Sequence, residues 1–87
     1  MNNNDLIDVV LMAKHAGGKQ WEGMGTTKFR VMPRMGENVV LDIDGVGHIY
    51  KVVAVHHPDQ PATCAADIYI VHIGDLLEEL KRLRTDN

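Results

Sequence analysis

The sequence contains no serine, and this absence excludes every mechanism that depends on a serine nucleophile. Cys64 is the only cysteine, so the chain cannot form an internal disulfide, and this usage is typical of a reducing compartment. The sequence has no apolar run long enough to span a bilayer, and its N-terminus lacks the basic and apolar regions of a signal peptide. We therefore expect a cytoplasmic protein that does not enter a membrane.

Aromatic residues and positive charge are also scarce. Aromatic side chains make up 5% of the chain, and 12 acidic residues outnumber 9 lysines and arginines, for a formal net charge of −3. Because phosphate affinity depends mainly on positive charge, this balance disfavours general nucleic-acid binding. The 87 residues, 45% of them hydrophobic, predict one domain over residues 1–87. The core of so short a chain is only marginally stable without a partner.

Alternating apolar residues predict five strands, which are the main evidence for the fold class. The first covers residues 5–14, where β-branched and aliphatic residues dominate. The same stretch also fits a helical stripe, so a helix is the alternative there; we prefer the strand. The other strands are expected at residues 28–32, 38–43, 48–57 and 67–73.

Glycine, proline and one change of period organise the rest of the chain. Residues 15–27 contain four glycines and no apolar period, which predicts a flexible connection or the wide end of a hairpin. Pro33 ends a strand, and the Asp-Gly-Val-Gly run at 44–47 supplies the positive φ angles of a tight hairpin. After Asp75, a capping residue, four leucines at helical spacing predict a C-terminal helix: Leu76, Leu77, Leu80 and Leu83. This order predicts a mainly β fold, a small five-stranded SH3-like or half-open barrel with one C-terminal helix.

Two short motifs resemble those of a known group of proteins. The corner Pro33-Arg34-Met35-Gly36-Glu37 precedes one strand, and the strand Tyr50-Lys51-Val52-Val53-Ala54-Val55-His56 follows the hairpin. This pattern, which covers about residues 33–56, is similar to that of small uncharacterised SH3-like β-barrel proteins of bacteria, phages and mobile elements. The resemblance implies a small barrel. It implies no activity.

The binding candidates come from the first half of the chain. Trp21 is the only tryptophan, and Met24 lies near it in the glycine-rich segment. Tryptophan, methionine and arginine are enriched where proteins contact partners, so Trp21, Met24, Arg30 and Arg34 are the expected binding residues. Two arrangements of Trp21 stay open at this point: it lies exposed on the loop, or it folds back to plug one end of the barrel.

No residue pattern predicts catalysis, a metal or a cofactor. Five histidines suggest a metal site, but His56 and His57 are adjacent on a strand and therefore point to opposite faces. In an antiparallel pair around the loop at 58–65, His56 and His72 would lie about 13 Å apart, too far to share a metal ion. Cys64 has no glycine-rich oxyanion loop beside it, as a thiol mechanism would need.

We therefore expect a non-enzymatic binding module, such as an accessory protein of a phage or mobile element that contacts a host macromolecule, with a protein as the expected partner. The first alternative is a nucleic-acid-binding small barrel, using a basic groove with aromatic rings. The second is a small-molecule binder or weak enzyme with His56, Tyr50 and Asp42 in the barrel mouth. Apolar residues on both strand faces also predict a homo-oligomer, because one short helix cannot cover them.

Overall fold

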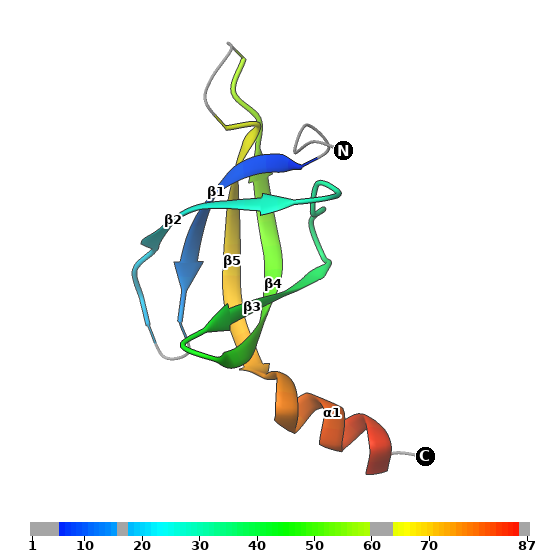
Figure 1. Cartoon of the computed structure of the whole chain (residues 1–87). Coiled ribbons are helices and arrows are strands. Elements are labelled where there is room, and N and C mark those ends of the chain that lie inside the picture. Colours follow the sequence, from blue (N-terminus) through cyan, green and yellow to red (C-terminus); the bar gives the residue numbers. More distant parts are fainter. Residues whose placement is uncertain (1–5, 16–17, 60–63, 86–87) are drawn as a thin grey trace.

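Five strands and one C-terminal helix make up the protein (Figure 1). The structure is a computed structural model that describes residues 6–15, 18–59 and 64–85. The elements are, in chain order, β1 (Ile7–Lys14), β2 (Glu22–Phe29), β3 (Asn38–Ile43), β4 (Val46–His56), β5 (Ala66–Asp75) and α1 (Leu76–Thr85). The segment at residues 5–14 is thus a strand and not a helix over the part that the structure describes.

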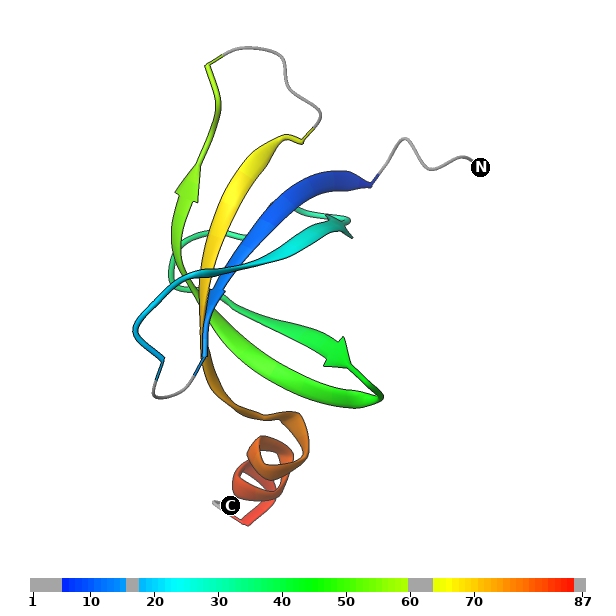
Figure 2. The same ribbon diagram turned by 90° about the vertical axis from the view of Figure 1, so that its left-hand side faces the viewer.

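The strands form one mixed sheet in the order β2-β1-β5-β4-β3. β1 runs parallel to the central strand β5, and the three other pairings are antiparallel. In Figure 2, the β1–β2 pair and the β3–β4 pair bend from β5 towards the same side, so that the sheet curls into a half-barrel. The expected mainly β fold, a half-open barrel with one C-terminal helix, is confirmed.

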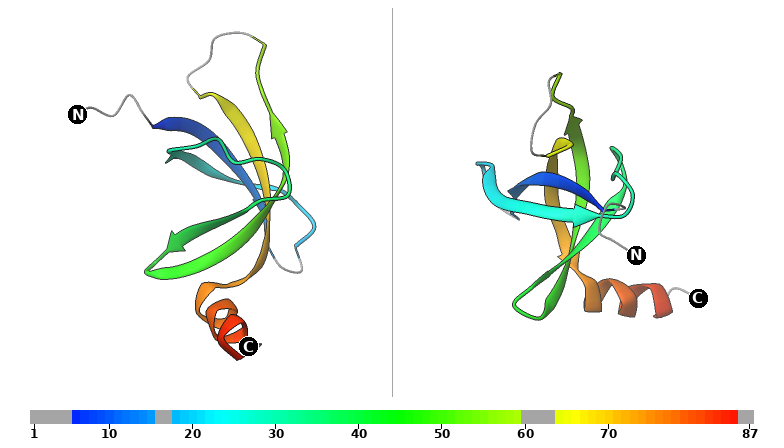
Figure 3. Two further views of the ribbon diagram at one scale, coloured as in Figure 1. Left: turned by 90° about the vertical axis from the view of Figure 1, so that its right-hand side faces the viewer. Right: turned by 45° about the horizontal axis from the view of Figure 1, so that its top comes forward.

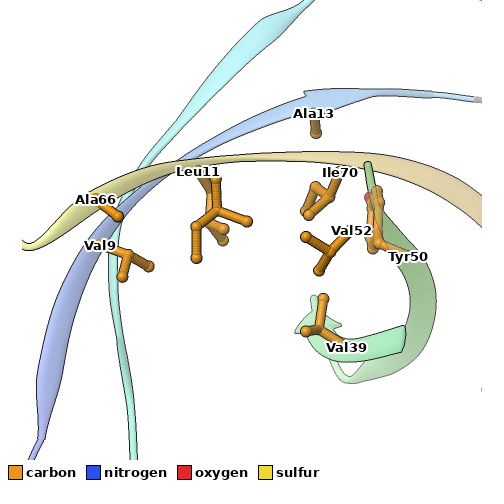
Figure 4. Packing of buried hydrophobic residues seen from close by; sticks show 9 residues of the cluster. Val9, Leu11, Ala13, Val39, Tyr50, Val52, Ala66 and Ile70 are labelled. Atoms are coloured by element: carbon orange, nitrogen blue, oxygen red, sulfur yellow. The ribbon is translucent and has the colours of Figure 1, made fainter. Parts of the chain in front are cut away.

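The core fills the concave side of the half-barrel. Buried side chains from neighbouring strands point to this side (Figure 4), and they include Val9 and Leu11 of β1, Val52 of β4 and Ile70 of β5. Ile68 of β5 belongs to the same buried cluster. The alternation expected for β1 and β5 is confirmed, because every second residue is buried over residues 9–13 of β1 and 66–70 of β5. Burial of each such aliphatic side chain contributes about 1.5–3 kcal/mol to the free energy of unfolding, relative to a side chain that stays exposed.

The prediction of a segment without a strand over residues 15–27 is wrong for its second half. Glu22–Phe29 forms β2, which pairs with β1, whereas Arg30 to Met32 of the expected strand at 28–32 lie outside any strand. Gly25 has a positive φ of 79° where the register between β1 and β2 shifts. This bulge interrupts the alternation, which is why the glycine-rich sequence shows no strand period.

The C-terminal helix is fixed at its first turn and extends away from the sheet (Figure 3). The Asp75 carboxylate accepts a 2.7 Å hydrogen bond from the Leu77 backbone N–H, which confirms Asp75 as the N-cap. Leu76 packs on Gly47 so closely that a Cβ atom there would lie 2.9 Å from Leu76 Cδ2. Within the described residues, no helix is long and apolar enough to cross a membrane.

The bulge in β2 predicts different effects for two glycines on the same strand. Gly25→Ala should lower the free energy of unfolding by about 1–2 kcal/mol, because an L-residue is strained at this φ. Gly23→Ala is the matched control: its Cβ would meet only Met12 Sδ, at an ordinary 3.9 Å. Urea denaturation should show that Gly23→Ala is equal to or more stable than the parent. Equal destabilisation of both variants would contradict the bulge.

Candidate binding groove on the open side of the half-barrel

The open side of the half-barrel lies between β2 and β3, the two edge strands of the sheet. Each edge strand is paired on one side only, so its other side presents backbone N–H and C=O groups without a ladder partner. Three hollows follow one another along this side: adjoining hollows share Phe29 at one junction and Ile43 at the other. We call this series the groove.

The middle hollow, of about 340 Å³, has one wall from β2 and one from β3. Met24 and Phe29 line the β2 wall, and Leu41 and Ile43 line the β3 wall, with Leu11 between them. These four wall residues are half-buried and pack against the core cluster. The walls combine apolar and polar groups, because polar side chains also line this hollow: Thr26, Thr27, Lys28 and Asp42.

The hollow beside it, of about 520 Å³, lies at the corner that carries the first motif. The Glu37 carboxylate accepts a 2.8 Å hydrogen bond from the Arg34 backbone N–H, and Gly36 takes a positive φ of 94°. The backbone N–H of Gly36 donates to the Val52 carbonyl, and the Val52 N–H donates to the Glu37 carbonyl, both at 2.8 Å. The Pro-Arg-Met-Gly-Glu motif thus has an architectural role: it ties the corner to β4.

The third hollow, of about 360 Å³, is lined by three histidines, one tyrosine and one isoleucine: His15, His48, His72, Tyr50 and Ile43. His48 Nδ1 lies 3.1 Å from His72 Nε2, and the Tyr50 hydroxyl lies 3.5 Å from His15 Nδ1. Tyr50 is 1% exposed, and burial raises the pKa of its phenol above the ordinary value. Tyr50 therefore stays a neutral hydrogen-bonding group at neutral pH.

Trp21 lies on the convex face of the sheet, where it neither plugs the half-barrel nor hangs on a free loop. Its ring is half-exposed and packs edge-on against Tyr69, with 5.1 Å between centroids, and the Lys14 ammonium lies 4.8 Å from its centre. On the other side of Tyr69, His56 follows at 4.9 Å. Trp21, Tyr69 and His56 form a continuous row, which we call the aromatic row.

The four expected binding residues do not form one surface. Met24 lines the groove, and Arg30 and Arg34 are exposed in the connection that follows β2. Trp21 precedes the other end of β2, so about nine residues, or roughly 30 Å of extended chain, separate it from Arg30. The groove and the aromatic row are therefore separate candidate surfaces.

The polar residues expected at a barrel mouth do not converge either. Tyr50 is buried on the concave side, His56 belongs to the aromatic row, and Asp42 accepts a 2.9 Å hydrogen bond from the Gly45 N–H in the hairpin turn. The pairing of β4 with β5 is as expected, with His56 opposite Asp67 and Tyr50 opposite His72. The contact between His48 and His72 was missed, although this register places them as near neighbours.

No metal site is arranged among the residues that the structure describes. They include no group of three or more histidine, cysteine, aspartate or glutamate side chains placed to hold a metal ion. Cys64 is a half-exposed free thiol. No protein-family model matches the chain, and no curated protein or solved structure matches it either.

Proposed function

We propose that the protein is a non-enzymatic binding module that holds an extended segment of a partner protein in the groove. The observation that carries this proposal is the pair of edge strands, which face one open side and place half-buried apolar side chains along it, next to polar ones. An extended segment can pair with such an edge through main-chain hydrogen bonds and place alternate side chains in apolar hollows. The partner would supply the strand that the half-barrel lacks.

The dimensions of the groove favour a short linear ligand. The β3 edge spans the six residues Asn38–Ile43, about 20 Å of strand. Three adjoining hollows along this edge accommodate side chains in series better than one compact molecule. Exposed charges of both signs, such as Asp42 and Arg30, border the groove, so apolar contact and backbone pairing would supply most of the affinity.

The origin of the partner is part of the proposal. The resemblance over residues 33–56 supports an accessory protein of a phage or mobile element. Its partner would then be a macromolecule of the host. The residues expected to contact it are Met24, Phe29, Leu41 and Ile43, with Arg30 and Arg34 at the border of the groove.

A random peptide library selected on the protein tests this proposal. We expect enriched peptides with apolar residues at every second position, and backbone amide shifts on binding over residues 22–29 and 38–43. N-methylation of alternate peptide bonds should weaken binding about tenfold, because it removes main-chain donors without changing side chains. Methylation at the intervening bonds is the matched control. Shifts confined to Trp21 and Tyr69, or no enrichment, would contradict the groove.

A nucleic-acid-binding function is the second candidate, and the aromatic row is the observation that favours it. Half-exposed rings beside Lys14 can stack with bases of a single strand. In that case oligo-dT should quench Trp21 fluorescence, less so as salt rises, and Tyr69→Ala should weaken binding about tenfold. Arg84→Gln, which removes one charge from α1, is the control. Salt-independent quenching, or none, excludes this candidate.

We also propose self-association through the apolar residues of α1. Leu77 is 62% exposed and Leu83 is 50% exposed, so the helix leaves much of its leucine surface uncovered in one copy. At tens of micromolar we expect a sedimentation mass above 9.7 kDa. Leu77→Glu should return it to the monomer mass, whereas Val31→Glu, at a site 72% exposed in the connection that follows β2, should not. A monomeric parent protein would refute the proposal.

A further inference from the structure

The third hollow, at one end of the groove, is lined by three histidines and one tyrosine, and we call it the histidine hollow. These hydrogen-bonding side chains are not needed to bind a peptide by backbone pairing and apolar contact. His15 follows β1, His48 and Tyr50 belong to β4, and His72 belongs to β5. Their rings are close neighbours: the centroids of His48 and His72 lie 5.2 Å apart, and Tyr50 lies 5.2 Å from His72. Three strands thus converge to place hydrogen-bonding rings around one hollow.

The contact between His48 and His72 allows this pair to carry a positive charge. At 3.1 Å, one of the two ring nitrogens donates a hydrogen bond to the other. The neutral pair then has one further N–H group, on an outer nitrogen. One added proton gives both outer nitrogens an N–H group while the shared hydrogen bond stays intact. These two outer N–H groups lie at opposite ends of the pair and point apart, so one of them at a time can donate to a given carboxylate.

No carboxylate of the described chain lines this hollow to neutralise that charge. Glu22 of β2 contacts His15, with 3.3 Å between Oε1 and Nε2. Asp75 of β5 is the register partner of His48, but its Oδ1 accepts hydrogen bonds from the first turn of α1. Within the described residues, the contact of the Tyr50 hydroxyl is a long one to His15, at 3.5 Å, so the hydroxyl can donate to another acceptor.

We propose that the histidine hollow is a carboxylate-binding subsite of the groove. One outer N–H group of the His48–His72 pair and the Tyr50 hydroxyl donate hydrogen bonds to the carboxylate oxygens, and Ile43 contacts the apolar part of the ligand. An imidazolium donor forms a stronger hydrogen bond to a carboxylate than a neutral group does. Its assignment to a bound peptide rests on the proposed function, whereas binding of the carboxylate itself does not.

A single amino-acid probe tests the subsite without the partner. N-acetyl-leucine should shift the imidazole NMR signals of His48 and His72 in a saturable manner. N-acetyl-leucinamide, which has the same side chain and no charge, should bind at least about tenfold more weakly. This comparison uses the parent protein, so it does not depend on the folding of any variant.

Variants then assign the donors. His48→Ala and His72→Ala should each weaken N-acetyl-leucine binding at least about fivefold. His56→Ala, which removes a histidine from the convex face, should leave it unchanged. Equal affinity for the acid and the amide, or equal loss with all three variants, would overturn the proposal. Equal binding of phosphate or chloride would also overturn it, because it would show only general attraction of anions.

Two further results separate the sources of the carboxylate and the two proposals. Tighter binding of N-acetyl-leucine than of the α-amide of N-acetylglutamic acid would assign the subsite to a chain terminus. The reverse order would assign it to an acidic side chain. If N-acetyl-leucine binds while peptide selection fails, the subsite stands and the proposed function falls. If peptides bind in the groove without a preference for carboxylates, the subsite alone is refuted.

Discussion

The parallel pairing of β1 with β5 is the constraint on which the rest of the structure depends. Because β1 occupies one side of the central strand and β4 the other, β2 and β3 can only be edges. The curl of the sheet brings these edges to one side, where no sixth strand among the described residues connects them. The concave core and the groove both follow from this arrangement.

The local features of the chain serve this arrangement. The corner at residues 33–37 is tied to β4 by reciprocal backbone hydrogen bonds, so one end of the groove is held in place. The bulge at Gly25 bends β2 and allows Met24 to pack against the core although its strand is rich in glycine. At the other end, the histidine hollow is formed by three strands at once. The groove is therefore held by backbone hydrogen bonds at the corner, by the packed rings of the histidine hollow at the other end, and by apolar contacts with the core between them.

Strand existence and the terminal helix could be predicted from the sequence, because alternation in β1, β3 and β5 and the leucine spacing of α1 are undisturbed. The Asp44-Gly45 turn was also predictable, since both residues take positive φ angles there. β2 could not be predicted, because Gly23 and Gly25 carry no side chain from which an alternating pattern could be inferred. The groove and the histidine hollow depend on which strands pair, and pairing of β1 with β5 spans most of the chain without a local signal.

The close packing of Leu76 on Gly47 holds the first residue of α1 against the β3–β4 hairpin, and β3 forms one wall of the groove. The ten residues of α1 extend about 15 Å from this point of contact, so tilting the helix axis by about ten degrees about Leu76 displaces the far end of the helix by about 2–3 Å.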